Sequence, residues 1–135
     1  MKTPQEIINR MLEKDQFSNW LGIRVEHLEK GSCTLKMTVS ALMLNGHHIA
    51  HGGISYALAD SALAFAANSH GRKGVSIETA ISHIKTVQEN DELTAIASEI
   101  NSGKSIGRYE VLITNSANVL VAKFHGTVFF TDENW

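Results

Sequence analysis

The stretch that decides the fold runs from Met43 to Gly71 and reads MLNGHHIAHGGISYALADSALAFAANSHG. Its first part is a loop rich in glycine and histidine. Its second part, from Ile54 to Asn68, contains no glycine or proline and has alanine at six positions. Alanine is the strongest helix former, so a helix is predicted over about residues 53–68. Apolar side chains occur nearly all round it, which is typical of a helix buried inside a domain.

On both sides of this helix the apolar residues alternate with polar ones, which is the period of a half-buried strand. Before the helix, two such runs flank the turn Lys30-Gly31-Ser32 and predict a hairpin. After the helix, alternation predicts strands at 75–81, 93–100, 106–114 and 119–131. The pattern indicates an antiparallel sheet wrapped around the central helix.

A short amphipathic helix over residues 4–15 is predicted at the start of the chain. Thr3 and Glu6 have the spacing of a capping box, and Pro4 stands at the first helical position. The whole chain, residues 1–135, is therefore expected to form a single α+β domain. One helix covers only one face of such a sheet, so its other surface and its edges suggest a homo-oligomer.

Composition narrows the class of protein. The chain has 135 residues, of which 43% are hydrophobic and 19% charged, as in an ordinary globular domain. A net charge of −2 gives no basic excess with which to bind nucleic acid. The chain shows neither a secretory signal nor an apolar run of the ~18 residues that span a bilayer. We expect a cytoplasmic protein with no nucleic-acid or membrane partner. The single cysteine, Cys33, excludes an intrachain disulfide.

Asp60 is the most informative residue of the predicted helix, because it lies near the middle of an otherwise apolar segment. Burying an unpaired carboxylate costs several kcal/mol. The helix must therefore turn Asp60 toward an opening, or a partner must satisfy it. A catalytic carboxylate fits this position, and so does a structural carboxylate hydrogen-bonded to the backbone.

The start of the helix carries a second candidate feature, His51-Gly52-Gly53. The first N–H groups of a helix lack internal partners, and the helix dipole makes that end positive. Such an end can stabilise the negative charge that develops on a carbonyl oxygen, although two glycines also serve simply to turn a chain. Gly52 and Asp60 are ~12 Å apart along the helix axis. A site that uses both therefore points to an oligomer with its site at the subunit interface.

The loop histidines raise the question of a metal. His47 and His51 have the i, i+4 spacing of a helical metal pair. The glycines on either side indicate a loop instead, and no second cluster of ligands completes a set. We expect no bound metal.

Four short motifs in this stretch occur together at fixed spacing: Asn45-Gly46-His47, His51-Gly52-Gly53, Leu58-Ala59-Asp60-Ser61-Ala62 and Asn68-Ser69-His70-Gly71. They resemble the signature of the hotdog-fold thioesterases, and most closely that of the PaaI-like group of the phenylacetate pathway. The similarity in length and element order extends over nearly the whole chain. One departure is that Lys85-Thr86-Val87 stands where relatives often carry an Arg-Pro pair.

The resemblance implies a hotdog fold, homodimers paired into tetramers, and hydrolysis of acyl-CoA without a metal or prosthetic group. By position, Asp60 matches the catalytic carboxylate and Gly52 the backbone donor to the thioester carbonyl. Asn45 and His51 match residues that orient water or that carbonyl. The remaining candidate contacts to substrate are Gly53, Ser61, Ser76, Lys104 and Arg108.

The expected function is hydrolysis of an aryl- or medium-chain acyl-CoA, such as phenylacetyl-CoA or hydroxyphenylacetyl-CoA. Asp60 would act as general base or as nucleophile, and the residues do not decide between these roles. Two alternatives are a hotdog hydratase or dehydratase, which would use His51 with Asp60, and a non-catalytic acyl-CoA-binding protein. The H-G-G…D pattern favours hydrolysis over hydration. A pure binding protein gains nothing from burying the charge of Asp60.

Overall fold

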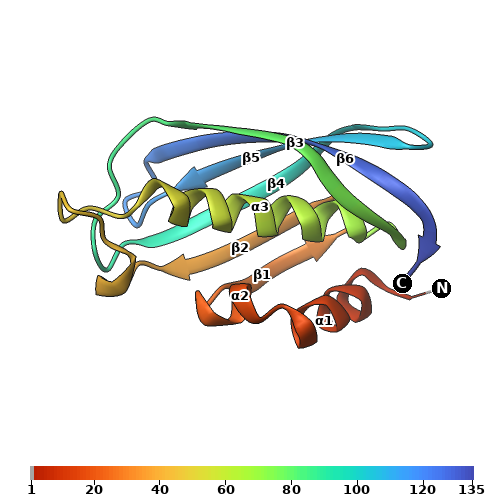
Figure 1. Ribbon diagram of the computed structural model, residues 1–135, viewed down its shortest axis with the longest axis horizontal. Coiled ribbons are helices and arrows are strands. Elements are labelled where there is room, and N and C mark those ends of the chain that lie inside the picture. The colour runs from red at the N-terminus through yellow and green to blue at the C-terminus, as the bar shows by residue number, and fades with distance from the viewer. Residues whose placement is uncertain (1) are drawn as a thin grey trace.

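The computed structural model describes residues 2–135, and Figure 1 shows a curved sheet with one long helix lying across it. In chain order the elements are α1 (Pro4–Lys14), α2 (Gln16–Trp20), β1 (Arg24–Glu29), β2 (Ser32–Thr38), the 3-10 helix η1 (Ala41–Met43), α3 (Gly52–Asn68), β3 (Arg72–His83), β4 (Glu92–Ser102), β5 (Ile106–Thr114) and β6 (Leu120–Asn134). The α+β architecture expected from the sequence is confirmed.

The sheet has six strands in the order β1-β2-β4-β5-β6-β3. All neighbouring strands pair antiparallel. The chain crosses from β2 to the far edge of the sheet through α3, so β1 and β3 form the two edges. Figure 1 shows α3 in front of the sheet, with α1 and α2 beside β1.

The helix α3 forms the centre of the core. Leu58, Leu63 and Phe65 are at most 1% exposed, and burying each such side chain contributes about 1.5–3 kcal/mol. A methyl group at Gly126 of β6 would collide with Cδ1 of Leu63. A glycine at this position therefore lets the helix lie close against the sheet.

The first helix begins at the predicted capping box. The Glu6 N–H donates to Thr3 Oγ1 at 3.2 Å, and the Thr3 N–H donates to Glu6 Oε2 at 2.8 Å. The following helix, α2, was not predicted. Asp15 caps it by accepting from the Ser18 N–H at 2.9 Å. Five residues are too few for a hydrophobic period to mark such a helix in the sequence.

The edge strand β3 is longer than predicted and exposes apolar side chains. It begins at Arg72, where the register with β6 shifts. Val75 and Ile77 on it are 58% and 60% exposed. An unpaired edge with apolar side chains is a template for pairing with another strand. Between residues 2 and 135, no helix is both long and apolar enough to cross a membrane.

Candidate active site

His51 caps the start of α3 and leaves one backbone donor free. Its ring Nδ1 accepts from the Gly53 N–H at 2.8 Å, and its carbonyl oxygen accepts from the Ile54 N–H at 2.9 Å. Within residues 2–135 no group accepts a hydrogen bond from the Gly52 N–H. The free donor therefore stands at the positive end of the helix dipole. The Gly53 N–H, by contrast, is already used.

The Gly52 end of α3 borders a cavity of about 280 Å³. The loop before the helix, the first turn of the helix and the segment that follows β3 supply its lining: Asn45, Ile49, Ala50, Gly52, Ser55, His83, Ile84, Lys85, Thr86 and Val87. A free N–H on a residue that lines a cavity is available to a ligand oxygen.

Asn45 lines the same cavity as Gly52 and is held in a fixed orientation. Its Oδ1 accepts from the His47 N–H at 2.9 Å and from the Ile49 N–H at 3.4 Å. Two backbone donors on the oxygen assign the amide orientation and leave Nδ2 without an acceptor in the described part of the chain. Asn45 can thus present a second donor to a ligand in the cavity.

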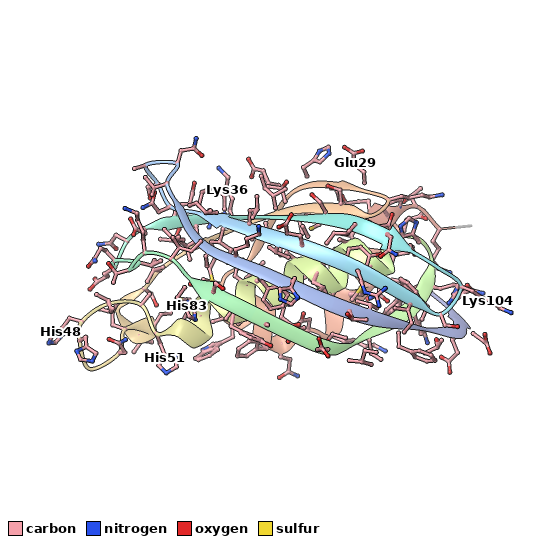
Figure 2. The ribbon with its side chains drawn as sticks, turned by 90° about the horizontal axis from the view of Figure 1, so that it is seen from above. Glu29, Lys36, His48, His51, His83 and Lys104 are labelled. Carbon is pink, nitrogen blue, oxygen red and sulfur yellow. The ribbon has the colours of Figure 1, made fainter. Side chains whose placement is uncertain are left out.

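His83 is the residue of this cavity that the sequence analysis missed. Its ring lies beside Gly52, where Nε2 is 3.0 Å and Cε1 is 3.2 Å from the position a Cβ would take. Figure 2 shows His83 and His51 near the start of α3. No spacing rule connects position 83 with position 52. Their contact arises only because β3 returns along the edge of the sheet beside the helix.

Asp60 lies on α3 about two turns beyond Gly52, ~12 Å along the axis, and it does not line the cavity. Its side chain is half-buried, and burial raises the pKa of this carboxyl above its ordinary value of 3.8. No hydrogen-bond or ion-pair partner for it occurs among residues 2–135. Within one chain, Asp60 therefore lies too far from Gly52 for both to contact the same small group.

Ser61 packs against α2, whereas Ser76 lies on the exposed edge of the sheet. The Ser61 hydroxyl lies 2.9 Å from the Ser18 hydroxyl of α2, and Ser18 in turn donates to Asp15 at 2.6 Å. Ser61 thus faces α2 and ties it to α3. Ser76 is exposed on the β3 edge.

Lys104 and Arg108 lie in the turn between β4 and β5 and at the start of β5. Figure 2 places Lys104 at the end of the molecule opposite to His51 and His83. The Lys104 carbonyl oxygen accepts from Arg72 Nη2 at 2.5 Å, which fixes this turn to the start of β3. Within one chain these cations are remote from Gly52.

The described residues offer neither a metal site nor a reactive cysteine. No group of three or more His, Cys, Asp or Glu side chains that could hold a metal ion occurs in residues 2–135. Cys33 is fully buried in β2, and burial raises the pKa of its thiol to about 12. A thiol of that pKa is not a nucleophile at neutral pH.

Comparison with known proteins identifies the family. The family model described as the thioesterase superfamily matches residues 47–122, which is more than half of the chain. The chain belongs to the thioesterase superfamily. The matched segment contains the start of α3, Asp60 and His83.

Individual relatives agree with this assignment. The acyl-coenzyme A thioesterase PaaI of Escherichia coli (strain K12) is 39% identical over 116 residues, covering 86% of this chain and 83% of its own. A putative esterase of Archaeoglobus fulgidus is 34% identical over 131 residues, covering 97% of this chain and 85% of its own. The solved structure of the E. coli PaaI protein has a TM-score of 0.95 at 34% identity, covering 97% of this chain and 95% of that one.

These comparisons confirm the hotdog fold and the resemblance to the PaaI-like group that the four motifs suggested. They also confirm the enzyme class, so this thioesterase is a thioester hydrolase.

Proposed function

We propose that this thioesterase hydrolyses acyl-CoA thioesters that carry an aryl or medium-chain acyl group, such as phenylacetyl-CoA or hydroxyphenylacetyl-CoA. The products are the free acid and CoA. The observation that carries the proposal is the unpartnered Gly52 N–H, which stands at the positive end of α3 on a residue that lines a cavity. The name of the E. coli relative supports acyl-CoA as the substrate class.

In the proposed reaction, the Gly52 N–H donates to the thioester carbonyl oxygen as negative charge develops on it. Asn45 Nδ2 and His51 orient the carbonyl or the attacking water. The proposed reaction requires no metal or prosthetic group, and CoA enters it only as part of the substrate.

Asp60 brings about attack on the thioester carbonyl carbon by one of two routes. As a general base it takes a proton from water, and the resulting hydroxide adds to the carbonyl carbon. As a nucleophile it adds directly and forms an anhydride, which water then hydrolyses. In both routes the C–S bond breaks and CoA leaves as the thiolate. A single turnover in ¹⁸O-labelled water distinguishes them, since only the anhydride route can place the label in the Asp60 carboxylate.

The proposed active site is shared by two subunits of a homodimer, and dimers of dimers are the expected tetramer. Asp60 comes from the partner of the subunit that supplies Gly52. The separation of these residues along one rigid helix supports this arrangement. So does the unpaired β3 edge, where exposed Val75 and Ile77 would be covered by a second β3.

The direction of β3 supports a role for the remote cations. The strand runs from Arg72, beside Lys104, to His83, beside Gly52. Antiparallel two-fold pairing of β3 edges brings the Lys104 end of one subunit to the Gly52 end of the other. We therefore propose that Lys104 and Arg108 contact the CoA phosphates. Ser76 and Ser61 would lie nearer the acyl end, with Gly53 lining the approach.

The direct test is free-thiol release from a panel of acyl-CoAs with short, medium, long and aryl acyl groups, together with an assay for hydration of an enoyl-CoA. The proposal expects thiol release, fastest with aryl or medium-chain groups. Hydration of the enoyl-CoA without thiol release would contradict it and favour the hydratase alternative. Binding of acyl-CoA without turnover would favour a non-catalytic role.

A further inference from the structure

The ring of His83 lies in contact with the position that a Cβ at residue 52 would take. Its Nε2 lies 3.0 Å from the Cβ position of Gly52, closer than Cε1 at 3.2 Å and Cδ2 at 3.7 Å. The ring therefore turns a nitrogen toward the residue whose N–H is unpartnered. Both residues line the same cavity of about 280 Å³.

Nothing in the described chain uses this imidazole. No hydrogen bond or ion pair engages the His83 ring within residues 2–135, and the side chain is exposed to the cavity. The contrast with His51 is direct, because the Nδ1 of His51 is occupied in capping α3. A ring held beside the oxyanion donor but left unpaired is available to a ligand.

Covalent geometry limits the distance between the two donors. A Cβ position is about 2.5 Å from the backbone nitrogen of its own residue. Since His83 Nε2 is 3.0 Å from that position, it lies at most about 5.5 Å from the Gly52 nitrogen. Two donors that share one acceptor, each at about 2.9 Å, must be less than about 5.8 Å apart. The two groups satisfy this limit.

We infer that His83 Nε2–H donates the second hydrogen bond to the thioester carbonyl oxygen that the Gly52 N–H binds. His83 is then a catalytic residue of this thioesterase, and its hydrogen bond strengthens as the carbonyl oxygen becomes an oxyanion. The inference rests on the proposed function, since it needs an acyl thioester in this cavity. A side chain at position 52 would begin 3.0 Å from His83 Nε2, so the ring would have to shift to make room for it.

The test compares three variants on the best substrate of the acyl-CoA panel. His83→Ala removes the donor, His83→Gln retains an N–H on a side chain of similar reach, and His125→Ala is the control. His125 is an exposed histidine on β6. We expect His83→Ala to lower kcat about 10²-fold with little change in KM. His83→Gln should recover at least part of that loss, and His125→Ala should match the wild type.

A second measurement follows the wild-type ring itself. The probe is a dethia analogue of phenylacetyl-CoA, in which CH₂ replaces the thioester sulfur and the carbonyl remains. Its binding should shift the ¹⁵N resonance of His83 Nε2 and the amide resonance of Gly52 together. This readout does not depend on how well the variants fold.

The outcomes separate this inference from the proposed function. Active wild-type enzyme with unchanged kcat in folded His83→Ala would overturn the role of His83 alone. A Gln variant as slow as the Ala variant, or an Nε2 resonance that the analogue does not move, would do the same. A wild-type protein that neither hydrolyses the panel nor binds the analogue would overturn the proposed function, and the role of His83 with it.

Discussion

Gly52 and Asp60 lie on the same helix, about two turns and ~12 Å apart along its axis, and only Gly52 borders the cavity at the start of α3. No loop motion can shorten this distance, because α3 is continuous from Gly52 to Asn68. We therefore propose that a carbonyl bound at Gly52 meets the Asp60 carboxylate of a partner chain.

Asp60→Asn keeps the size of the side chain but removes the carboxylate that we propose as base or nucleophile. Loss of such a group costs about 10²–10⁴-fold, and we expect kcat to fall by that range with little change in KM. Steady-state kinetics on the best acyl-CoA provide the measurement. An Asn variant within about threefold of the wild type in kcat would show that Asp60 does not take part in the chemistry.

The same substitution should stabilise the protein at neutral pH. Burial raises the pKa of Asp60 above 3.8, so the folded state holds this proton to higher pH than the unfolded state does. The wild type therefore loses stability as pH rises from the unfolded pKa to the folded pKa. Asp60→Asn is free of this loss, so its advantage in Tm should grow over that window and then stay constant.

Thermal unfolding across that pH range tests this prediction, with Asp132→Asn as the matched control on an exposed aspartate of β6. The control should follow the wild type at every pH. An Asp60→Asn variant that is less stable than the wild type at neutral pH would indicate a structural carboxylate with favourable partners.

The pH dependence of activity should also report the ionisation of Asp60. In the proposed mechanism Asp60 acts in its deprotonated form, so kcat/KM should fall on the acid side with an apparent pKa above 3.8. The pH profile of the wild type measures this directly. A profile that stays flat down to the ordinary pKa of an aspartate would contradict the raised value.

Gly52→Ala should lower kcat by ~10²–10³-fold, the usual cost of losing one oxyanion donor. Alanine keeps its N–H, so the cause must be displacement, and the new Cβ would lie 3.0 Å from His83 Nε2. The cost should therefore be smaller when it is measured in a His83→Ala background. Gly46→Ala is the control, because a Cβ there meets nothing within 4 Å. Equal costs of Gly52→Ala in both backgrounds would rule out the collision.

Chelation should have no effect. Residues 2–135 contain no group of three or more potential metal-ligating side chains, so prolonged dialysis against EDTA should leave kcat and Tm unchanged. Loss of activity to the chelator and its return on addition of zinc would overturn the metal-free mechanism.

Much of the fold follows from local pattern. The capping box at Thr3 and the alternation from Ile106 to Thr114 predicted α1 and β5 within a residue of their bounds. The run of alanines predicted α3. The helix α2 escaped prediction, because what holds it is a cap at Asp15 and the contact between Ser18 and Ser61, and neither gives a periodic signal.

Only the part of the candidate site that local sequence marks could be predicted. His51-Gly52-Gly53 marks the start of α3 by local chemistry, and Asp60 stands out as a charge in an apolar helix. His83 belongs to β3, and it meets Gly52 only after the chain has crossed to the far edge of the sheet. Two residues brought together by topology leave no mark in the spacing of a single sequence.

The most direct test of the shared site uses two inactive variants, Asp60→Asn and Gly52→Val, co-expressed with different affinity tags. In a mixed dimer one site receives both substitutions and the other receives neither. Random pairing makes about half of the dimers mixed, so roughly a quarter of wild-type activity should return. The specific activity of heterodimers purified through both tags is the measurement, and this account predicts half the wild-type value. Verified heterodimers as inactive as either parent would show that each site lies within one chain.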